Sequence, residues 1–236
     1  QTEKQPQRAR CGWISAYPAL SAKRALSPTV EEVTASEKFG SMDEPINDSK
    51  GSGCLLRAVP IGLSYSDDPA YILDLAANTA ALTHGNEVAW VASGVLALII
   101  SLIIHQELSI AEAVNETLKA LDKSFPDSRK AVHELLSSIW SARPLATSAS
   151  SDLDAIHALG EGWVANEALA IGILCALRYE NDIAGAMTFA ANHGGNSNAT
   201  AAIAGMLVGA RIGFNAIPDR FVDRLELVDV ILELAD

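Results

Sequence analysis

The stretch from Val88 to Ile104, VAWVASGVLALIISLII, constrains the fold more than any other part of this chain. Its 17 residues carry no charge, so a helix built from them is apolar on every side. That length lies at the short edge of the roughly 17–25 residues that span a bilayer. Because the chain has no second stretch of this kind and no basic flank beside this one, we expect a buried core helix and no membrane association.

Helix start signals surround this segment. Asp68-Pro69 predicts a helix beginning at Pro69. Ser109 followed by Glu112 is a capping-box pattern that predicts an amphipathic helix. The same spacing from Thr29 to Glu32 predicts a short helix over about 29–38.

The rest of the chain also favours helices. We expect them over 127–143, 165–177, 182–192, 199–214 and 218–234, with loops over 40–54 and most of 143–163. No run of alternating polarity is long enough for a sheet, so the sequence predicts an all-α fold with one core. A polar tail is expected at 1–12, followed by one domain over 13–236.

Charge and cysteine content limit the partners and the compartment. The net charge is −12, with 7 Lys/Arg and 7 Asp/Glu in residues 1–50 and 10 against 22 in the remainder. Since the body is acidic and has no basic stripe, we expect no nucleic-acid partner. The three cysteines are odd in number and no two have CxxC spacing, which indicates a reducing, cytoplasmic setting.

A glycine-bearing loop at 47–60, NDSKGSGCLLRAVP, is the first candidate site. Gly51, Ser52 and Gly53 allow a ligand to approach the backbone closely, and Ser49 and Lys50 add a hydroxyl and a cation. Such a loop before a helix can hold a phosphate, although the spacing differs from a P-loop. An ordinary connecting loop is the alternative.

Two further stretches each have a functional and a structural interpretation. His84 in the THG sequence at 83–85 is either a catalytic group or a capping or core histidine, and Gly85 is predicted to end a helix. Trp163 follows Gly160 and Gly162. An exposed indole there could stack on a base or sugar, whereas a buried one would anchor the next helix.

The last stretch is ANHGGNSNATAAIAGMLVGA, over 191–210. Gly194 and Gly195 break one helix, and Asn196, Ser197 and Asn198 are suitable N-cap residues for the next. Glycines recur at every fourth position at 205, 209 and 213, which predicts another backbone packed closely on that face. A capped, tightly packed core helix therefore explains the pattern without any ligand.

Four motifs in order resemble the ADP-ribosylglycohydrolase family. They are NDSKGSGCLLRAVPIGL, TAALTHG, LGEGWVANEALAIGILCALR and NHGGNSNATAAIAGMLVGARIGFNAIP. The resemblance covers about Trp13 to the end and implies an orthogonal all-α globule with an ADP-ribose cleft and, in active members, two magnesium ions. On the matching positions it implies these candidate ligand-binding residues: Ser49, Gly51, Ser52, Gly53, His84, Gly162, Trp163, Gly194 and Gly195.

The sequence departs from the family at its metal ligands. Active members carry Gly-Asp-Ser/Thr-Asp-Ser/Thr where this chain has Asn196, Asn198 and Ala199 at the three ligand positions. They also carry N-terminal Gly-Asp-Ala-x-Gly and Thr-Asp-Asp-Thr motifs that have no counterpart here, so we expect an N-terminally truncated domain. Magnesium prefers carboxylates, and Asn brings no charge. We therefore expect no bound metal and name no catalytic residue.

Three hypotheses follow from the resemblance. The first is a catalytically degenerate member that retains binding of ADP-ribose or of ADP-ribosylated protein. The second is an active hydrolase that removes ADP-ribose from protein side chains, with metal ligands supplied partly from outside this chain. The third is a non-catalytic interaction protein, with self-association or a partner chain covering the region of the N-terminal motifs.

Overall fold

The computed structural model describes residues 17–22, 26–36, 38–65 and 67–235 of the chain. Its secondary structure there is helical, apart from an isolated antiparallel bridge between Gly51 and Val164. The all-α expectation is confirmed. The α-helices are α2 Pro28–Ser36, α3 Val59–Ser64, α4 Pro69–Ala81, α5 Glu87–Gln106, α6 Ile110–Ser124, α7 Arg129–Ala146, α8 Asp152–His157, α9 Ala165–Arg178, α10 Ile183–Ala191, α11 Ser197–Ile212, α12 Asp219–Val222 and α13 Val228–Ala235.

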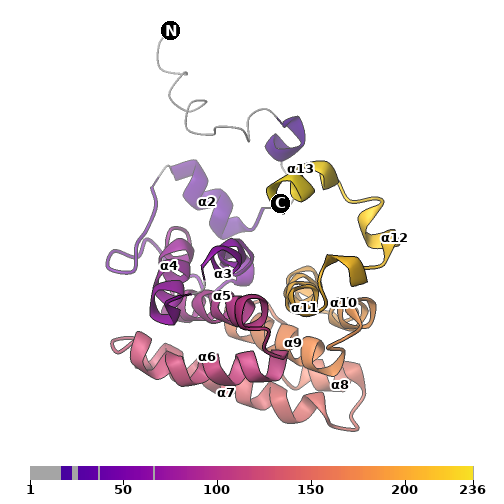
Figure 1. Cartoon of the computed structure of the whole chain (residues 1–236). Coiled ribbons are helices and arrows are strands. Elements are labelled where there is room, and N and C mark those ends of the chain that lie inside the picture. Colours follow the sequence, from indigo (N-terminus) through magenta and orange to yellow (C-terminus); the bar gives the residue numbers. More distant parts are fainter. Residues whose placement is uncertain (1–16, 23–25, 37, 66, 236) are drawn as a thin grey trace.

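Helix α5 forms the centre of the core. It packs against α3, α4, α6, α7, α9 and α11, and every residue from Val88 to Ile103 is buried. In Figure 1 the helices surround it, with α6 and α7 along the bottom, α2 and α13 at the top and α12 at the right. By length and composition alone α5 could cross a membrane, but 89% of its most apolar 18-residue window is buried inside the fold. The helix thus occupies the core position that its uniform apolarity predicts.

Local start signals place two neighbouring helices as expected. Asp68 caps α4 by accepting hydrogen bonds from the backbone N–H groups of Ala70 and Tyr71. Ser109 and Glu112 form the predicted capping box at α6. Each satisfies backbone donors that the first helical turn leaves open, which is why the sequence alone locates these ends.

Other boundaries differ from the prediction. The Ser27 hydroxyl, instead of Thr29, accepts the Val30 N–H at the start of α2, because the helix already begins at Pro28. The Thr29 hydroxyl shares a hydrogen bond with Ser49. The loop expected over 143–163 contains α8, capped by Ser151. The helix expected over 218–234 is two helices, with Leu227 at φ 60° just before the second.

The glycines of α11 do not bring another backbone close. Gly205 leaves room for the Met187 side chain of α10, and Gly209 faces the Ile183 side chain. The close approach to α11 is made instead by Gly172 of α9, where an added Cβ would lie 2.3 Å from Ile203 Cγ2. The expectation of small-residue packing was right for this region but wrong about the element that supplies the glycine.

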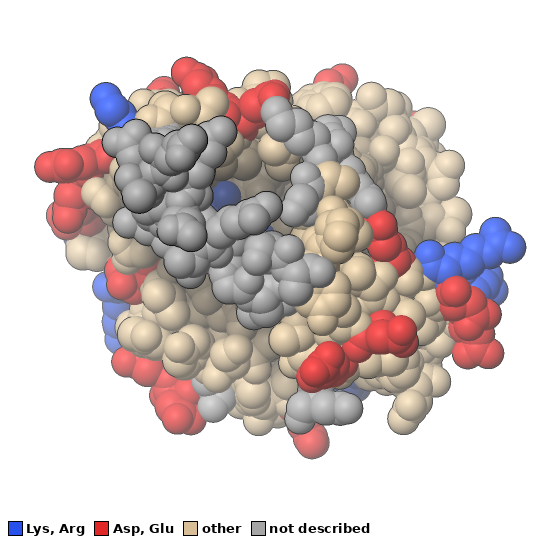
Figure 2. Space-filling view, turned by 90° about the horizontal axis from the view of Figure 1, so that it is seen from above, with Lys and Arg blue, Asp and Glu red and all other residues tan. Residues whose placement is uncertain are grey.

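Acidic side chains are spread over the face seen in Figure 2, most of them towards its edge. This distribution agrees with the excess of 29 Asp/Glu over 17 Lys/Arg in the chain. The expected polar tail at 1–12 lies outside the described residues. Between residues 17 and 22 the structure describes a short 3-10 turn, Pro18–Ser21.

Candidate functional site

The glycine loop at 49–53 lies against the turn that precedes α9. The Ser52 N–H donates to the Trp163 carbonyl at 3.2 Å, and the Ala165 N–H donates to the Lys50 carbonyl at 2.8 Å. These bonds flank the bridge between Gly51 and Val164. Two segments that sequence reasoning treated separately are therefore paired along their backbones.

The turn before α11 joins both of them. The Asn196 N–H donates to the Glu161 carbonyl at 2.8 Å, and Asn196 Nδ2 donates to Ser52 Oγ at 2.7 Å. A Cβ on Gly195 would lie 2.0 Å from the Glu161 carbonyl oxygen, so only glycine fits this close approach. The three segments thus form a closed ring of contacts, which we call the site ring: loop 49–53, turn 160–165 and turn 194–196.

The Asn196 side chain does not cap α11. Its amide group is directed to Ser52 and accepts no hydrogen bond from the first turn of this helix. Asn196 therefore occupies the predicted N-cap position without making the predicted capping bond. The Ser197 N–H donates to the Gly195 carbonyl at 2.8 Å, whereas the N–H groups of Asn198 and Ala199 make no hydrogen bond within the described residues and remain available to an anion.

Asn47 fixes the entry to the glycine loop. Its Oδ1 accepts the N–H groups of Ser49 at 3.0 Å and Gly85 at 2.8 Å, and its Nδ2 donates to the Thr83 carbonyl at 2.9 Å. A Cβ on Gly85 would lie 1.8 Å from the Asn47 carbonyl oxygen. Gly85 is therefore required for this contact and is not the predicted helix end, since α4 already stops at Ala81. Sequence reasoning missed Asn47, although an Asn two residues before Ser49 is a common Asx-turn signal.

The Lys50 side chain forms an ion pair with α7. Its Nζ lies 2.8 and 3.0 Å from the two carboxylate oxygens of Glu134 on α7, in a partly exposed ion pair. A pocket of about 590 Å³ lies on this side of the loop, lined among others by Lys50, Glu134 and Trp90. The Lys50 ammonium is thus an anchor of the loop and is already paired with a carboxylate.

His84 lies fully buried beneath the glycine loop. Thr83 Oγ1 accepts a hydrogen bond from Arg57 and lies 2.7 Å from His84 Nδ1. His84 Nε2 has no hydrogen-bond partner within the part of the chain that the structure describes. A Cβ on Gly51 would lie 3.3 Å from this nitrogen. Burial, with a smaller effect of the nearby Arg57 cation, lowers the pKa of His84 to about 4. The buried, neutral ring agrees with the interpretation of His84 as a core histidine.

Trp163 is exposed, with 57% of its surface accessible. Its Nε1 donates to Glu161 Oε2 at 3.1 Å, and the turn before it is held by Glu167, which accepts the N–H groups of Glu161 and Gly162 at 3.1 Å. Gly162 has φ 75°, in the left-handed region that favours glycine. The interpretation of Trp163 as a buried anchor is wrong, because more than half of its surface is exposed.

His193 supports the glycine pair from below. Its Nδ1 accepts the Gly195 N–H at 3.2 Å, and its Nε2 lies 2.9 Å from Thr200 Oγ1. Burial is the main reason that the pKa of His193 is lowered, which keeps Nδ1 free of a proton as this bond requires. In the sequence His193 is a histidine beside two glycines, and this pattern does not indicate that its ring accepts the Gly195 N–H. Gly194 is exposed and makes no comparable contact.

The residues at the family's metal positions do not fit a magnesium pair. The Asn196 amide nitrogen is hydrogen-bonded to Ser52, and Asn198 is exposed. The Ala199 side chain has no atom that could bind a metal ion. Among the described residues no group of three or more His, Cys, Asp or Glu side chains could hold a metal ion. Because magnesium binds best to carboxylate oxygens, this neutral donor set does not match that ion.

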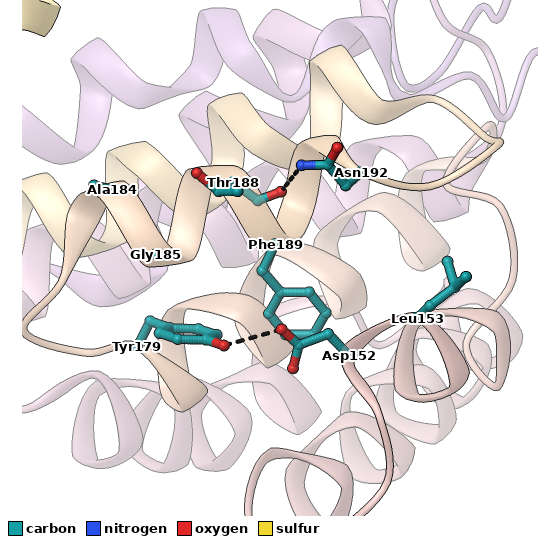
Figure 3. A pocket seen from close by; sticks show the side chains of 8 residues that line it. All are labelled: Asp152, Leu153, Tyr179, Ala184, Gly185, Thr188, Phe189 and Asn192. Atoms are coloured by element: carbon teal, nitrogen blue, oxygen red, sulfur yellow. Dashed lines mark hydrogen bonds between the residues drawn. The ribbon is translucent and has the colours of Figure 1, made fainter.

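A separate pocket of about 490 Å³ opens between α8 and α10 (Figure 3). Tyr179 donates to Asp152 Oδ2 at 2.9 Å across it, and the Phe189 ring lies edge-on to Tyr179 at 5.7 Å. This hydrogen bond is the largest cause of the raised pKa of Tyr179. None of the residues predicted for the site lines this pocket.

Comparison with protein families finds one match that spans nearly the whole chain. The model of the family described as ADP-ribosylglycohydrolase matches residues 4–236. No curated protein matches the chain.

Proposed function

This chain belongs to the ADP-ribosylglycohydrolase family, and from that premise we propose that it binds ADP-ribose, free or attached to a protein, without hydrolysing the bond. The observation that carries the proposal is the neutral start of α11, where Asn196, Asn198 and Ala199 occupy the family's metal positions. Binding and catalysis are separable at such a site because they depend on different groups.

The loss of hydrolysis follows from charge. The family resemblance implies two metal ions that orient the ribose and position water, which is a metal-assisted hydrolysis. Replacing two aspartates by asparagines removes two negative charges from the metal's surroundings, and Ala199 offers no ligand atom. The Asn196 amide nitrogen also faces Ser52, where it acts as a donor.

The retention of binding is supported by the site ring. Gly53 of its glycine loop is exposed, and the first turn of α11 has N–H groups without a side-chain cap, a combination that suits a pyrophosphate. Trp163 lies beside this loop, because its backbone carbonyl accepts the Ser52 N–H. Its side chain is exposed. Stacking of a base on such a ring is worth about 1–3 kcal/mol.

Calorimetry and a turnover assay test the two halves of the proposal. We expect titration with ADP-ribose to give saturable binding, and Trp163→Ala to weaken it by about tenfold, which corresponds to about 1.4 kcal/mol. The matched control is Trp140→Ala, because Trp140 is 54% exposed but lies on α7 outside the site ring. This control should bind as the unaltered protein does.

The turnover assay uses peptides carrying ADP-ribosyl-arginine or ADP-ribosyl-serine, with and without magnesium. We expect no release of ADP-ribose under either condition. Magnesium-dependent release would overturn the proposal in favour of an active hydrolase. Absence of any binding would favour a purely interacting protein.

A further inference from the structure

The bond from Asn196 to Ser52 joins segments that are 144 residues apart in the sequence. Its length is 2.7 Å, and Ser52 is 3% exposed. A short bond shielded from water is protected from competition by solvent, so its loss leaves polar groups without partners. The Ser52 hydroxyl is therefore used inside the fold instead of facing a ligand.

Each of these two residues also makes a second contact within the site ring. The Ser52 N–H is bonded to the Trp163 carbonyl, and the Asn196 N–H is bonded to the Glu161 carbonyl. The side-chain bond closes the ring, because the other two contacts both end on turn 160–165. Without it, the hydrogen bonds among the described residues connect loop 49–53 and turn 194–196 through that turn alone.

We propose that this hydrogen bond, with no metal ion, holds the glycine loop against the start of α11, so that ADP-ribose binding does not depend on a divalent cation. Asn196 and Ser52 are then positioning residues. The amide supplies a neutral donor at a position where the family resemblance implies a metal-binding carboxylate. A loop held before the ligand arrives loses less conformational entropy on binding. This inference deepens the proposed function and rests on it for the identity of the ligand.

Hydrogen exchange tests the positioning role without any ligand. In Asn196→Ala we expect the Ser52 amide to exchange about tenfold faster, which corresponds to about 1.4 kcal/mol and is in the range of one buried hydrogen bond. The Ser52 amide is bonded to Trp163 and not to Asn196, so a purely local effect of the substitution would leave it unchanged. The rate in the unaltered protein should be the same in EDTA and in millimolar magnesium.

Variants on both sides of the bond keep the test clear. Ser52→Ala removes the acceptor if Asn196→Ala does not fold, and the double variant should lose no more than either single variant, since all three remove one bond. Asn198→Ala is the matched control, because Asn198 is exposed and lies two residues away on the same helix. We expect it to leave exchange at Ser52 unaltered.

Calorimetry with ADP-ribose tests the consequence for binding. We expect the same Kd in EDTA and in magnesium within a factor of about two, and a Kd about tenfold higher in Asn196→Ala under both conditions. Binding that requires magnesium, or Ser52 exchange that does not respond to Asn196→Ala, would overturn the inference. If exchange responds as expected but the unaltered protein binds no ADP-ribose, the positioning role stands and the proposed function fails.

Discussion

Gly194 and Gly195 are adjacent, but only the second is required by its surroundings. A Cβ on Gly195 would lie 2.0 Å from the Glu161 carbonyl oxygen, whereas a Cβ on Gly194 has no atom within 4 Å. We expect Gly195→Ala to destabilise the fold by about 1–3 kcal/mol through overpacking. Gly194→Ala should change stability by less than about 0.5 kcal/mol. Urea unfolding of both variants measures the difference, and equal stabilities would contradict the close approach.

The neutral ring of His84 gives the stability of the protein a specific pH dependence. Its pKa is about 4 in the folded chain against 6.5 as the ordinary value. Between these values the unfolded chain binds more protons than the folded one, so stability falls as the pH falls. The full contribution is present above about pH 6.5 and lost as the pH approaches 4. It is on the order of 3 kcal/mol.

Unfolding of His84→Gln across this range checks the sign. We expect the variant to be less stable at neutral pH, because it disturbs the buried contact with Thr83, but to lose less stability between pH 6.5 and 4. Some slope should remain, because the pKa of His193 is also lowered by burial. The control is His133→Gln, an exposed position on α7, which should keep the original slope. An unchanged slope in His84→Gln would contradict the assignment.

At the scale of elements, the contact between α9 and α11 depends on one glycine. A Cβ on Gly172 would lie 2.3 Å from Ile203 Cγ2, so Gly172→Ala should destabilise the protein by about 1–3 kcal/mol. Gly209→Ala on α11 is the matched control, since its Cβ would lie 3.8 Å from Ile183 Cδ1 in ordinary contact. Alanine there should stabilise by about 0.4–1 kcal/mol, because it restricts the unfolded chain. Thermal unfolding should therefore move in opposite directions for the two variants.

Helices with strong local signals were predictable from the sequence. The uniform apolarity of Val88–Ile104 placed α5 in the core, and the capping residues Asp68 and Ser109 fixed the starts of α4 and α6. Short elements were not predictable in this way. Helix α8, for example, has six residues and little apolar periodicity. The break before α13 depends on Leu227 in the left-handed region, which no local residue preference signals.

The candidate site was predictable as pieces but not as an arrangement. Each of its segments carries glycines that suggest close backbone contact, and the family resemblance connects them to one ligand. Their pairing depends on bonds between distant residues, such as Ala165 with Lys50 and Asn196 with Ser52. A single sequence contains no signal for such long-range partners. The exposure of Trp163 likewise depends on how turn 160–165 is held.

At the scale of the whole molecule, the fold and the metal chemistry are independent. The core around α5 is built from apolar helices, and the α9–α11 contact involves none of the family's metal positions. Asn196 and Asn198 have nearly the volume of aspartate, so the neutral residues fit where carboxylates would. A chain can therefore keep the family's fold while the charge at the start of α11 is lost.

The stability of the whole chain should report ligand binding without magnesium. A ligand that binds only the folded state stabilises it by about 2.7 kcal/mol when its free concentration is 100 times Kd. For a chain of 236 residues each kcal/mol raises Tm by about 2–4 °C, so ADP-ribose should raise Tm by about 5–11 °C. We expect the same increase in EDTA, and no increase with magnesium alone, because the donor set at α11 is neutral. A Tm increase that appears only when both ADP-ribose and magnesium are present would show that a metal ion completes this site, contrary to the role assigned to Asn196.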